Sequence, residues 1–224
     1  MSRVYFCSDL HLGHWNILKY EPIRLDFVWE KYYKHKTSLE EFKAYVLGLY
    51  DSSEADARAK LKVILNQHDE LIINNWNNTV SKDDVVWFLG DLCMGNRNSV
   101  RNYLGKLQGI IRMVKGNHDT LPTKVYLDAG ARSVYEHPVV LKQHFILSHA
   151  PIEHMFGSTD NQFINIFGHV HSNPEIETVT NNQVCVCIER QELKPIQLAA
   201  FDSCDPVEKF AEEATRHSSV KTCK

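Results

Sequence analysis

One stretch decides the fold of this chain: residues 85–92, Val-Val-Trp-Phe-Leu-Gly-Asp-Leu. The first five residues are β-branched, aromatic or aliphatic without a polar interruption, which predicts a strand that is buried on both faces. Gly90 then allows the backbone to turn sharply, and Asp91 follows as a carboxylate at the end of the strand. Because ligands bind at this edge of the sheet in α/β folds, Asp91 is a candidate ligand-binding residue.

The same order, an apolar run followed by a residue that binds metals, recurs along the chain. Asp, His and Asn side chains suit divalent ions such as Mn²⁺, Fe²⁺ or Zn²⁺. Asp-x-His and Gly-His-x-His each place two such side chains on the same side of an extended turn. Two metals about 3.5–4 Å apart can hold a phosphoryl group, and they need a carboxylate between them. The recurrences are Asp9-Leu10-His11, Gly116-Asn117-His118-Asp119, Ser148-His149 and Gly168-His169-Val170-His171.

Length and composition are those of an ordinary globular protein. The chain has 224 residues, enough for one sizeable core, and is 43% hydrophobic and 24% charged. The formal net charge of -3 provides no general attraction to nucleic acid or to an anionic membrane. No apolar run approaches the roughly 20 residues of a membrane span. We therefore expect no membrane association and no stable nucleic-acid partner.

The N-terminus and the cysteines bear on the cellular compartment. Residues 1–3 lead directly into an apolar strand, so we expect no signal peptide. The six cysteines are scattered and form no CxxC pair. Cys185 and Cys187 alternate within residues 184–188 and share one face of a predicted strand. We therefore favour reduced thiols and a cytoplasmic location.

Helical periodicity dominates the segment from about residue 20 to residue 60. Ser38 to Glu41 is a capping-box pattern, and apolar residues follow it at helical spacing. Within this segment, residues 29–36 mix aromatic and basic side chains. They are either a solvated helix face with one apolar side or a lid that stacks a base and attracts phosphate. We interpret the whole segment as a helical insertion.

Outside the insertion, strands alternate with helices early in the chain and strands dominate later. This order predicts a mixed-sheet sandwich with helices outside. We expect one domain over residues 1–202, followed by a C-terminal helix and tail over residues 203–224. Beyond the strand that carries Asp91, helices are predicted at 61–78 and 100–107, and strands at 110–114, 133–141 with a break at Pro138, 144–147, 165–167, 183–189 and 195–201.

Taken together, the motifs resemble those of the calcineurin-like metallophosphoesterases. That family carries D-x-H, G-D, G-N-H-[DE], a lone His after a strand, and G-H-x-H, in this order. The chain looks most like the small single-domain bacterial and phage members. Here the motifs stand as Asp9-Leu10-His11, Gly90-Asp91, Gly116-Asn117-His118-Asp119, His149 and Gly168-His169-Val170-His171.

The resemblance implies the metallo-dependent phosphatase fold of the α/β (α+β) class. This is a four-layer αββα sandwich in which two mixed β-sheets are flanked by helices. It also implies two divalent metal ions, with Mn²⁺ as the first expectation and Fe, Ni or Zn as alternatives. The implied ligands are Asp9, His11 and His171 for the first metal, Asn117, His149 and His169 for the second, and Asp91 as the bridge between them.

The remaining site residues follow from the same motifs. The resemblance implies that His118 is a general acid or charge stabiliser, oriented by Asp119, a carboxylate that can hold the imidazole in one tautomer and raise its pKa. One position departs from the family, because Met94 stands where a charged residue is often found, which argues against a Ser/Thr protein phosphatase. His14 and Arg97 each closely follow a metal motif, and they are the candidates for contacting the substrate's non-bridging oxygens.

We therefore predict a binuclear metal-dependent phosphoesterase that hydrolyses phosphodiesters, with a cyclic nucleotide or another nucleotide-type ester as its substrate. Metal hydroxide would attack phosphorus, and His118 would assist departure of the alcohol. Alternatives on the same fold are a phosphomonoesterase or a nuclease, although the acidic charge balance disfavours the nuclease. A catalytically inactive binding scaffold is a further alternative, but no ligand is missing from the motifs.

Overall fold

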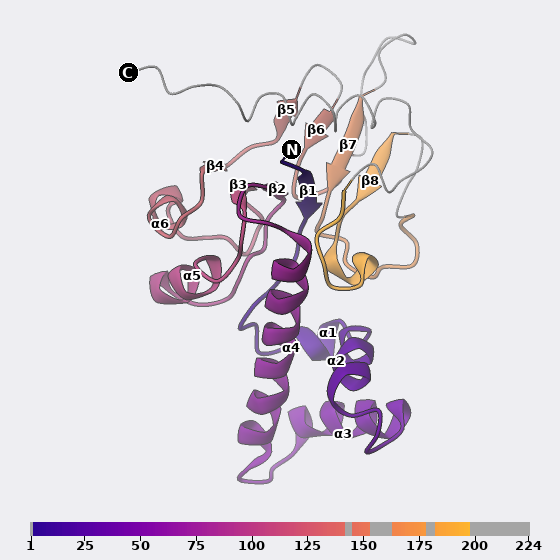
Figure 1. Ribbon diagram of the computed structural model, residues 1–224. Coiled ribbons are helices and arrows are strands. Elements are labelled where there is room, and N and C mark those ends of the chain that lie inside the picture. Colours follow the sequence, from indigo (N-terminus) through magenta and orange to yellow (C-terminus); the bar gives the residue numbers. More distant parts are fainter. Residues whose placement is uncertain (1, 142–144, 153–162, 178–181, 198–224) are drawn as a thin grey trace.

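The computed structural model describes residues 2–141, 145–152, 163–177 and 182–197. Two four-stranded sheets pack against each other, and helices flank them (Figure 1). This architecture confirms the predicted fold class. The C-terminal helix and tail predicted over residues 203–224 lie outside the described residues.

The strand that contains Trp87 lies inside the first sheet, buried along its whole length as predicted. All pairings among the four strands of this sheet are parallel. Phe6 of the first strand also forms an isolated antiparallel bridge with Ile196. This bridge is the part of the strand predicted at 195–201 that falls within the described residues. The order in space is β1 (Val4–Cys7), β2 (Val85–Phe88), β3 (Ile110–Val114) and β4 (Ser133–Tyr135).

The second sheet combines one antiparallel pairing with two parallel ones. Its first strand is separated from β4 at Pro138, so the predicted break is confirmed. The strand predicted at 183–189 is shorter, because a 3-10 helix occupies Ile188–Gln191. The order in space is β5 (Val139–Leu141), β6 (Phe145–Leu147), β7 (Ile164–Phe167) and β8 (Gln183–Cys185).

Alternation of side chains along the strands divides the apolar core into layers. Phe6 and Trp87 face the second sheet and pack with Leu147 and Ile166, which forms the layer between the two sheets. Neighbouring residues on the same strands face the other way and pack against the helices. The first sheet is therefore covered on both faces, as its uninterrupted apolar sequence requires.

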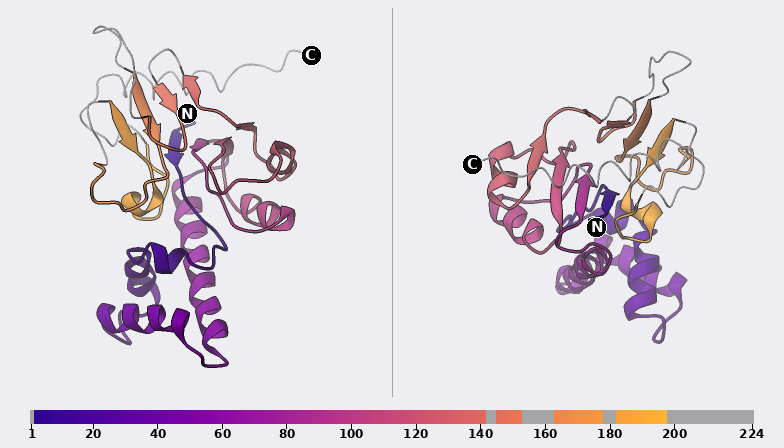
Figure 2. Two further views of the ribbon diagram at one scale, coloured as in Figure 1. Left: turned by 180° about the vertical axis from the view of Figure 1, so that it is seen from behind. Right: turned by 45° about the horizontal axis from the view of Figure 1, so that its top comes forward.

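The helices form two groups in space (Figures 1 and 2). One group lies beside the first sheet, and the other gathers around the far half of one long helix. None of the described helices combines the length and apolar character of a membrane span. The helices are α1 (Ile17–Tyr20), α2 (Arg24–Tyr32), α3 (Leu39–Asp51), α4 (Ala57–Thr79), α5 (Arg97–Leu104) and α6 (Thr123–Asp128).

The segment interpreted as a helical insertion contains α1, α2 and α3, and it begins close to the predicted boundary. The capping box at Ser38 is confirmed, since its hydroxyl accepts the Glu41 amide proton and the Glu41 carboxylate accepts the Ser38 amide proton. The aromatic side chains of residues 29–36 serve packing. Trp29 Nε1 donates to the Thr37 carbonyl, and the Tyr33 ring stacks on Phe42 at 4.5 Å between centroids. The stretch therefore fits a helix face with an apolar side better than a base-stacking lid.

Candidate metal centre

The predicted ligands converge because the strands that precede them run parallel. β1, β2 and β3 end at the same edge of the first sheet, and β6 and β7 end at the same edge of the second. The two edges meet, and each strand is followed within three residues by one of the predicted ligands. These are Asp9 after β1, Asp91 after β2, Asn117 after β3, His149 after β6 and His169 after β7.

Asp9, His11 and His171 form the first cluster, in which one ligand atom from each lies within 4.8 Å of the others. Asp9 Oδ1 lies 3.7 Å from His171 Nε2 and 3.9 Å from His11 Nε2. Asp9 Oδ1 and both ring nitrogens of His11 are buried without a hydrogen-bond partner among the described residues. Unpaired buried polar atoms are costly, so this donor set fits a bound divalent cation.

Asn117, His149 and His169 form the second cluster. His149 Nε2 lies 2.9 Å from Asn117 Oδ1 and 3.1 Å from His169 Nδ1. The other ring nitrogen, His149 Nδ1, lies 2.8 Å from the carbonyl oxygen of Leu89. A carbonyl only accepts, so Nδ1 carries the proton and Nε2 is left to bind a metal. This donor set also fits a divalent cation.

Asp91 lies between the two clusters. Its Oδ2 is 3.4 Å from His11 Nε2 and 3.4 Å from His149 Nε2, one histidine of each cluster. Burial by itself would raise the pKa of Asp91, but His149, His11 and the His118 amide lower it to about 2. The carboxylate is therefore ionised at neutral pH in a position from which it can contact a cation in either cluster.

The backbone is strained at most of these ligands. Five of them are non-glycine residues in the left-handed region, where each costs of order 1–3 kcal/mol. Such strain persists only where the surrounding structure enforces it, and it concentrates at functional sites. The residues are Asp9 (φ 60°), His11 (φ 50°), Asp91 (φ 61°), His169 (φ 72°) and His171 (φ 49°).

Two glycines of the motifs allow the turns after β2 and β3 to approach each other. A Cβ atom at Gly116 would lie 2.1 Å from Asp91 Oδ1, and one at Gly90 would lie 2.5 Å from the Gly116 nitrogen. Gly90 also adopts φ 94°. Any larger residue at position 116 would displace the carboxylate that lies between the clusters.

His118 and His14 line the edge of the site. His118 is exposed, and its ring centroid lies 5.1 Å from that of His11. The His14 ring lies 5.4 Å from the His11 ring and 6.0 Å from the His118 ring. An exposed imidazole beside buried ligands is accessible to a substrate, which suits the transfer of a proton to a leaving group.

Asp119 accepts hydrogen bonds from backbone amides of the turns after β2 and β3. Its Oδ2 accepts the backbone amides of Asp91 at 2.6 Å and Gly116 at 3.0 Å, and its Oδ1 accepts that of Leu92 at 3.2 Å. The carboxylate therefore holds the turn that carries Asp91. Among the described residues no hydrogen bond joins it to the imidazole of His118, whose orientation by Asp119 stays a prediction. Burial raises the pKa of Asp119 to about 6.

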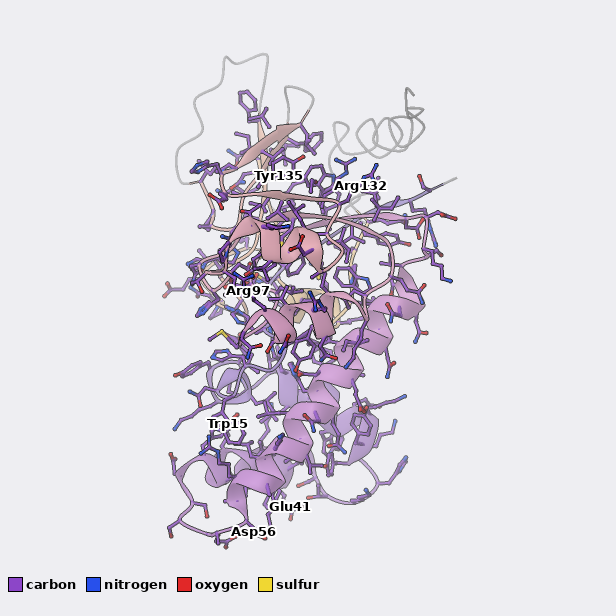
Figure 3. All side chains as sticks on the ribbon, turned by 90° about the vertical axis from the view of Figure 1, so that its left-hand side faces the viewer. Trp15, Glu41, Asp56, Arg97, Arg132 and Tyr135 are labelled. Carbon is purple, nitrogen blue, oxygen red and sulfur yellow. The ribbon has the colours of Figure 1, made fainter. Side chains whose placement is uncertain are left out.

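Arg97 is the first residue of α5, and its side chain is exposed (Figure 3). Within the described residues, no hydrogen bond or ion pair joins it to the candidate ligands. His14, whose ring packs beside that of His11, is the better placed of the two residues predicted to contact substrate.

A buried polar pair beneath the first cluster was not predicted. Arg24 of α2 and Glu189 are both fully buried and form an ion pair, and Glu189 also contacts His171. Glu189 follows the apolar run 184–188, the same order that marks Asp91, so the sequence carried a signal for it. Arg24 carried none, because an arginine in an amphipathic helix is usually on the solvated face.

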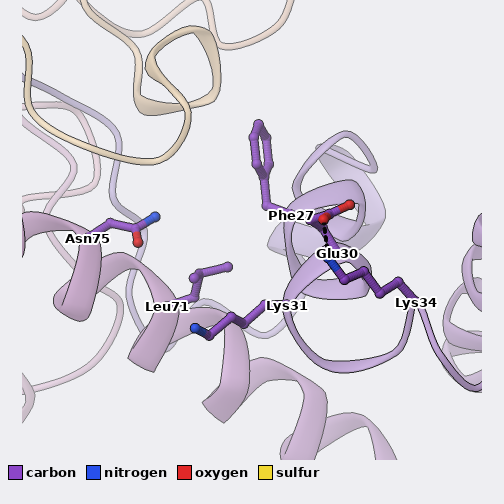
Figure 4. Close-up of a pocket in the computed structure, with 6 residues that line it drawn as sticks. All are labelled: Phe27, Glu30, Lys31, Lys34, Leu71 and Asn75. Atoms are coloured by element: carbon purple, nitrogen blue, oxygen red, sulfur yellow. Dashed lines mark hydrogen bonds and ion pairs between the residues drawn. The ribbon is translucent and has the colours of Figure 1, made fainter.

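A shallow groove lies between α2 and α4, with a volume of about 410 Å³ (Figure 4). Lys31 and Lys34 line it together with Phe27, so basic and aromatic side chains do meet on this face. Lys34 is already paired with Glu30 at 2.6 Å. The lining residues of α2 lie toward the end of the helix opposite Arg24, and none of the predicted metal ligands lines the groove.

Two layers of sheet with Asp, His and Asn gathered at their joined edge define a metal-binding sandwich of the phosphoesterase type. The family model for "Calcineurin-like phosphoesterase" matches residues 2–183. The chain belongs to this family, as the motifs indicated. Its members are divalent-metal-dependent hydrolases of phosphoric esters.

Similar curated proteins match part of the chain. An uncharacterized protein of Methanocaldococcus jannaschii, MJ1445, is 28% identical over 55% of this chain and 51% of its own length. The Gene 66 proteins of Mycobacterium phages L5 and D29 are 27% and 30% identical over 53% and 58% of this chain. The matched regions cover 41% and 46% of the two phage proteins. The chain thus matches only about half of each relative's length.

Among solved structures, a protein of unknown function from Aquifex aeolicus, AQ665, superposes with a TM-score of 0.53 at 20% identity. The match covers 90% of this chain and 98% of that protein, and it supports the fold. The nuclease MPE of Pseudomonas putida matches with a TM-score of 0.34 at 18% identity, over 75% of this chain and 62% of its own.

Replacing Gly116 by Ala should weaken metal binding, because the added methyl group would collide with Asp91 Oδ1. We expect Mn²⁺ affinity to fall about 10–100-fold, as for other disturbances of a ligand's support. Isothermal titration calorimetry measures it. Gly48→Ala is the matched control, since nothing described lies within 4 Å of the added Cβ atom. Because Gly48 lies in α3, this substitution should raise the free energy of unfolding by about 1 kcal/mol. Equal Mn²⁺ affinity in both variants would contradict the close-approach argument.

Metal binding should strengthen as the pH rises. Burial lowers the pKa of His149, but Asp91 and Asp9 outweigh it and raise that pKa to about 9. The metal-binding nitrogen of an imidazole must be unprotonated, so below pH 9 the Mn²⁺ ion that binds at the second cluster displaces a proton from His149. The apparent dissociation constant should fall about tenfold per pH unit between roughly pH 6 and 8. Calorimetry in buffers of different ionisation enthalpy counts the released proton, and a constant affinity over this range would be the contrary result.

Proposed function

We propose that this chain is a binuclear metal-dependent phosphodiesterase. One observation carries the proposal: a single carboxylate oxygen, Asp91 Oδ2, is equally close, at 3.4 Å, to a histidine of each ligand cluster. A pair of cations bridged by a carboxylate is the arrangement that holds both oxygens of a phosphoryl transfer. The seven predicted ligands would bind two ions, for which Mn²⁺ is our first expectation and Fe, Ni or Zn are alternatives.

Bound at these clusters, the two ions would supply Lewis acidity and lower the pKa of a coordinated water toward about 7. The side chains of the protein hold the site together and donate to the substrate. Asp91, held by Asp119 through its backbone amide, keeps the two halves of the site together. His118, exposed at the edge, donates a proton to the departing alcohol oxygen. His14 lies beside it and can donate to a non-bridging oxygen of the phosphate.

The charges around the site favour a diester over a monoester. Arg24 and Arg190, the arginines that contact the described candidate ligands, both donate to backbone carbonyls. The Glu21 carboxylate lies within 4.8 Å of ligand atoms of His171 and Glu189. Within the described residues no guanidinium contacts Glu21 to offset its charge against a monoester dianion, whereas a diester carries a single negative charge. We infer a nucleotide-type diester as the substrate class.

Asp91→Asn should lower kcat at least about 100-fold and reduce the Mn²⁺ content of the purified protein, because the bridge loses its charge. The assay is steady-state hydrolysis of bis-p-nitrophenyl phosphate with added Mn²⁺, combined with metal analysis. Asp83→Asn is the matched control, since Asp83 is exposed at the opposite end of β2. Unchanged kcat in Asp91→Asn would remove the bridging role.

His118→Asn should lower kcat by about 10²–10⁴ where the leaving group needs a proton. The loss should be much smaller on bis-p-nitrophenyl phosphate, whose nitrophenolate leaves readily, than on a 2′,3′-cyclic nucleotide, whose leaving group is an alkoxide. Equal losses on both would indicate charge stabilisation in place of proton donation. His137→Asn, at an exposed position between β4 and β5, is the control and should retain full activity.

The substrate class is tested by a panel at one Mn²⁺ concentration. It comprises 2′,3′- and 3′,5′-cyclic nucleotides, cyclic dinucleotides, short oligonucleotides and p-nitrophenyl phosphate. A preference for nucleotide diesters over the monoester supports the proposal. Faster hydrolysis of the monoester would point to a phosphomonoesterase, and salt-dependent cleavage confined to oligonucleotides would point to a nuclease.

A further inference from the structure

Arg24 and Glu189 form a fully buried ion pair beneath the first ligand cluster. Arg24 Nε donates to Glu189 Oε1 at 2.8 Å, and Arg24 Nη2 donates to the same oxygen. The exposed fraction of both side chains is 0%. A buried ion pair costs desolvation free energy and is weak evidence of a role in stability, so its other contacts are informative.

The guanidinium of Arg24 also holds the turn that carries two ligands of the first cluster. Its Nη2 donates to the Asp9 carbonyl at 2.6 Å, and its Nη1 donates to the Leu10 carbonyl at 2.9 Å. These carbonyls belong to the strained turn between Asp9 and His11, both of which have left-handed φ angles. A guanidinium suits this role, because its five fixed N–H donors lie in one plane and hold several acceptors in a set geometry.

The long helix α4 supports the same turn through His68 and Asp69. His68 Nε2 lies 3.1 Å from Arg24 Nη1, and His68 Nδ1 lies 3.0 Å from Asp69 Oδ1. The other oxygen of Asp69 accepts the Gly13 amide at 2.9 Å. The turn is therefore held at its start by α2 and at its end by α4.

Glu189 orients the remaining ligand of the first cluster. Its Oε1 lies 2.8 Å from His171 Nδ1. A carboxylate that accepts the Nδ1 proton leaves His171 Nε2 for the metal, and Nε2 is the atom that faces Asp9 at 3.7 Å. In the second cluster the equivalent proton of His149 goes to the Leu89 carbonyl, which the pair does not touch.

We propose that Arg24 and Glu189 are positioning residues that assemble the first metal site and leave the second to the strands alone. This inference rests on the proposed function, since it takes the two clusters as the two metal sites. It also gives the helical segment a role at the site, because α2 supplies the side chain that shapes the turn after β1. The second cluster is built from the ends of β3, β6 and β7 without it.

The test measures both Mn²⁺ dissociation constants by equilibrium dialysis, with electron paramagnetic resonance to detect spin-coupled pairs. In Glu189→Gln, one constant should rise about 10–100-fold while the other changes by less than about twofold. The coupled signal should give way to that of isolated Mn²⁺. Asp84→Asn is the matched control, because it breaks the Arg3 ion pair at the opposite ends of β1 and β2 and should keep both sites.

Loss of stability is separated from loss of positioning by a second variant. Arg24→Met combined with Glu189→Leu removes both charges, so no buried charge is left unpaired and the fold should be retained. It should still lose one site selectively. Two wild-type sites in this variant or in Glu189→Gln would overturn the inference, and so would equal weakening of both sites. Fewer than two sites in the wild-type protein would instead contradict the proposed binuclear function.

A measurement on the wild-type protein needs no variant to fold. Long-range ¹H–¹⁵N spectra of the Zn²⁺-loaded protein report which ring nitrogen of His171 carries the proton. We expect a proton on Nδ1 and the metal on Nε2. A metal on Nδ1, the atom that contacts Glu189, would overturn the role of Glu189.

Discussion

The carboxylate of Asp91 is the constraint on which the rest of the site depends. It lies close to His11, which follows a strand of the first sheet, and to His149, which follows a strand of the second. The two sheets must therefore pack in one register for the distances from Asp91 to both histidines to be short. The His118 amide donates to the Asp91 carboxylate, and the Asp119 carboxylate accepts the backbone amides of Asp91 and Gly116. These hydrogen bonds fix the position of Asp91 relative to the turns after β2 and β3. The apolar layer between the sheets therefore has a functional consequence, because a change in their packing would move one half of the site relative to the other.

The site also contains backbone conformations and buried polar atoms that cost free energy. Five candidate ligands have strained left-handed backbones, and the first cluster contains buried polar atoms that no described residue satisfies. Costs of this kind are sustained only by a rigid surrounding structure. Here the support consists of parallel strands buried on both faces and of hydrogen bonds from buried side chains. A cation in the first cluster would satisfy Asp9 and His11 and offset part of that cost.

The contacts of the helical segment fit a supporting role at the site better than the role of a lid. Its aromatic residues are used in packing, as the stacked rings of Tyr33 and Phe42 show. Its contribution to the site is Arg24, whose contacts reach the turn after β1 and, through Glu189, the last histidine motif. The segment therefore supports the candidate ligands from within the protein, and in the proposed function His14 and His118 face the substrate.

Sequence by itself determined the strands, their buried ends and the type of candidate ligand at each end, because these features are local: an apolar run, often a glycine, then Asp, Asn or His. The resemblance of the motifs extended this to the fold and to the pairing of ligands. Only the tertiary structure decided that Asp119 holds the Asp91 turn, that Arg97 is exposed at the start of α5, and that Arg24 and Glu189 meet. The reason is physical: Arg24 and Glu189 are 165 positions apart, and such contacts depend on how whole elements pack and not on the residues beside them.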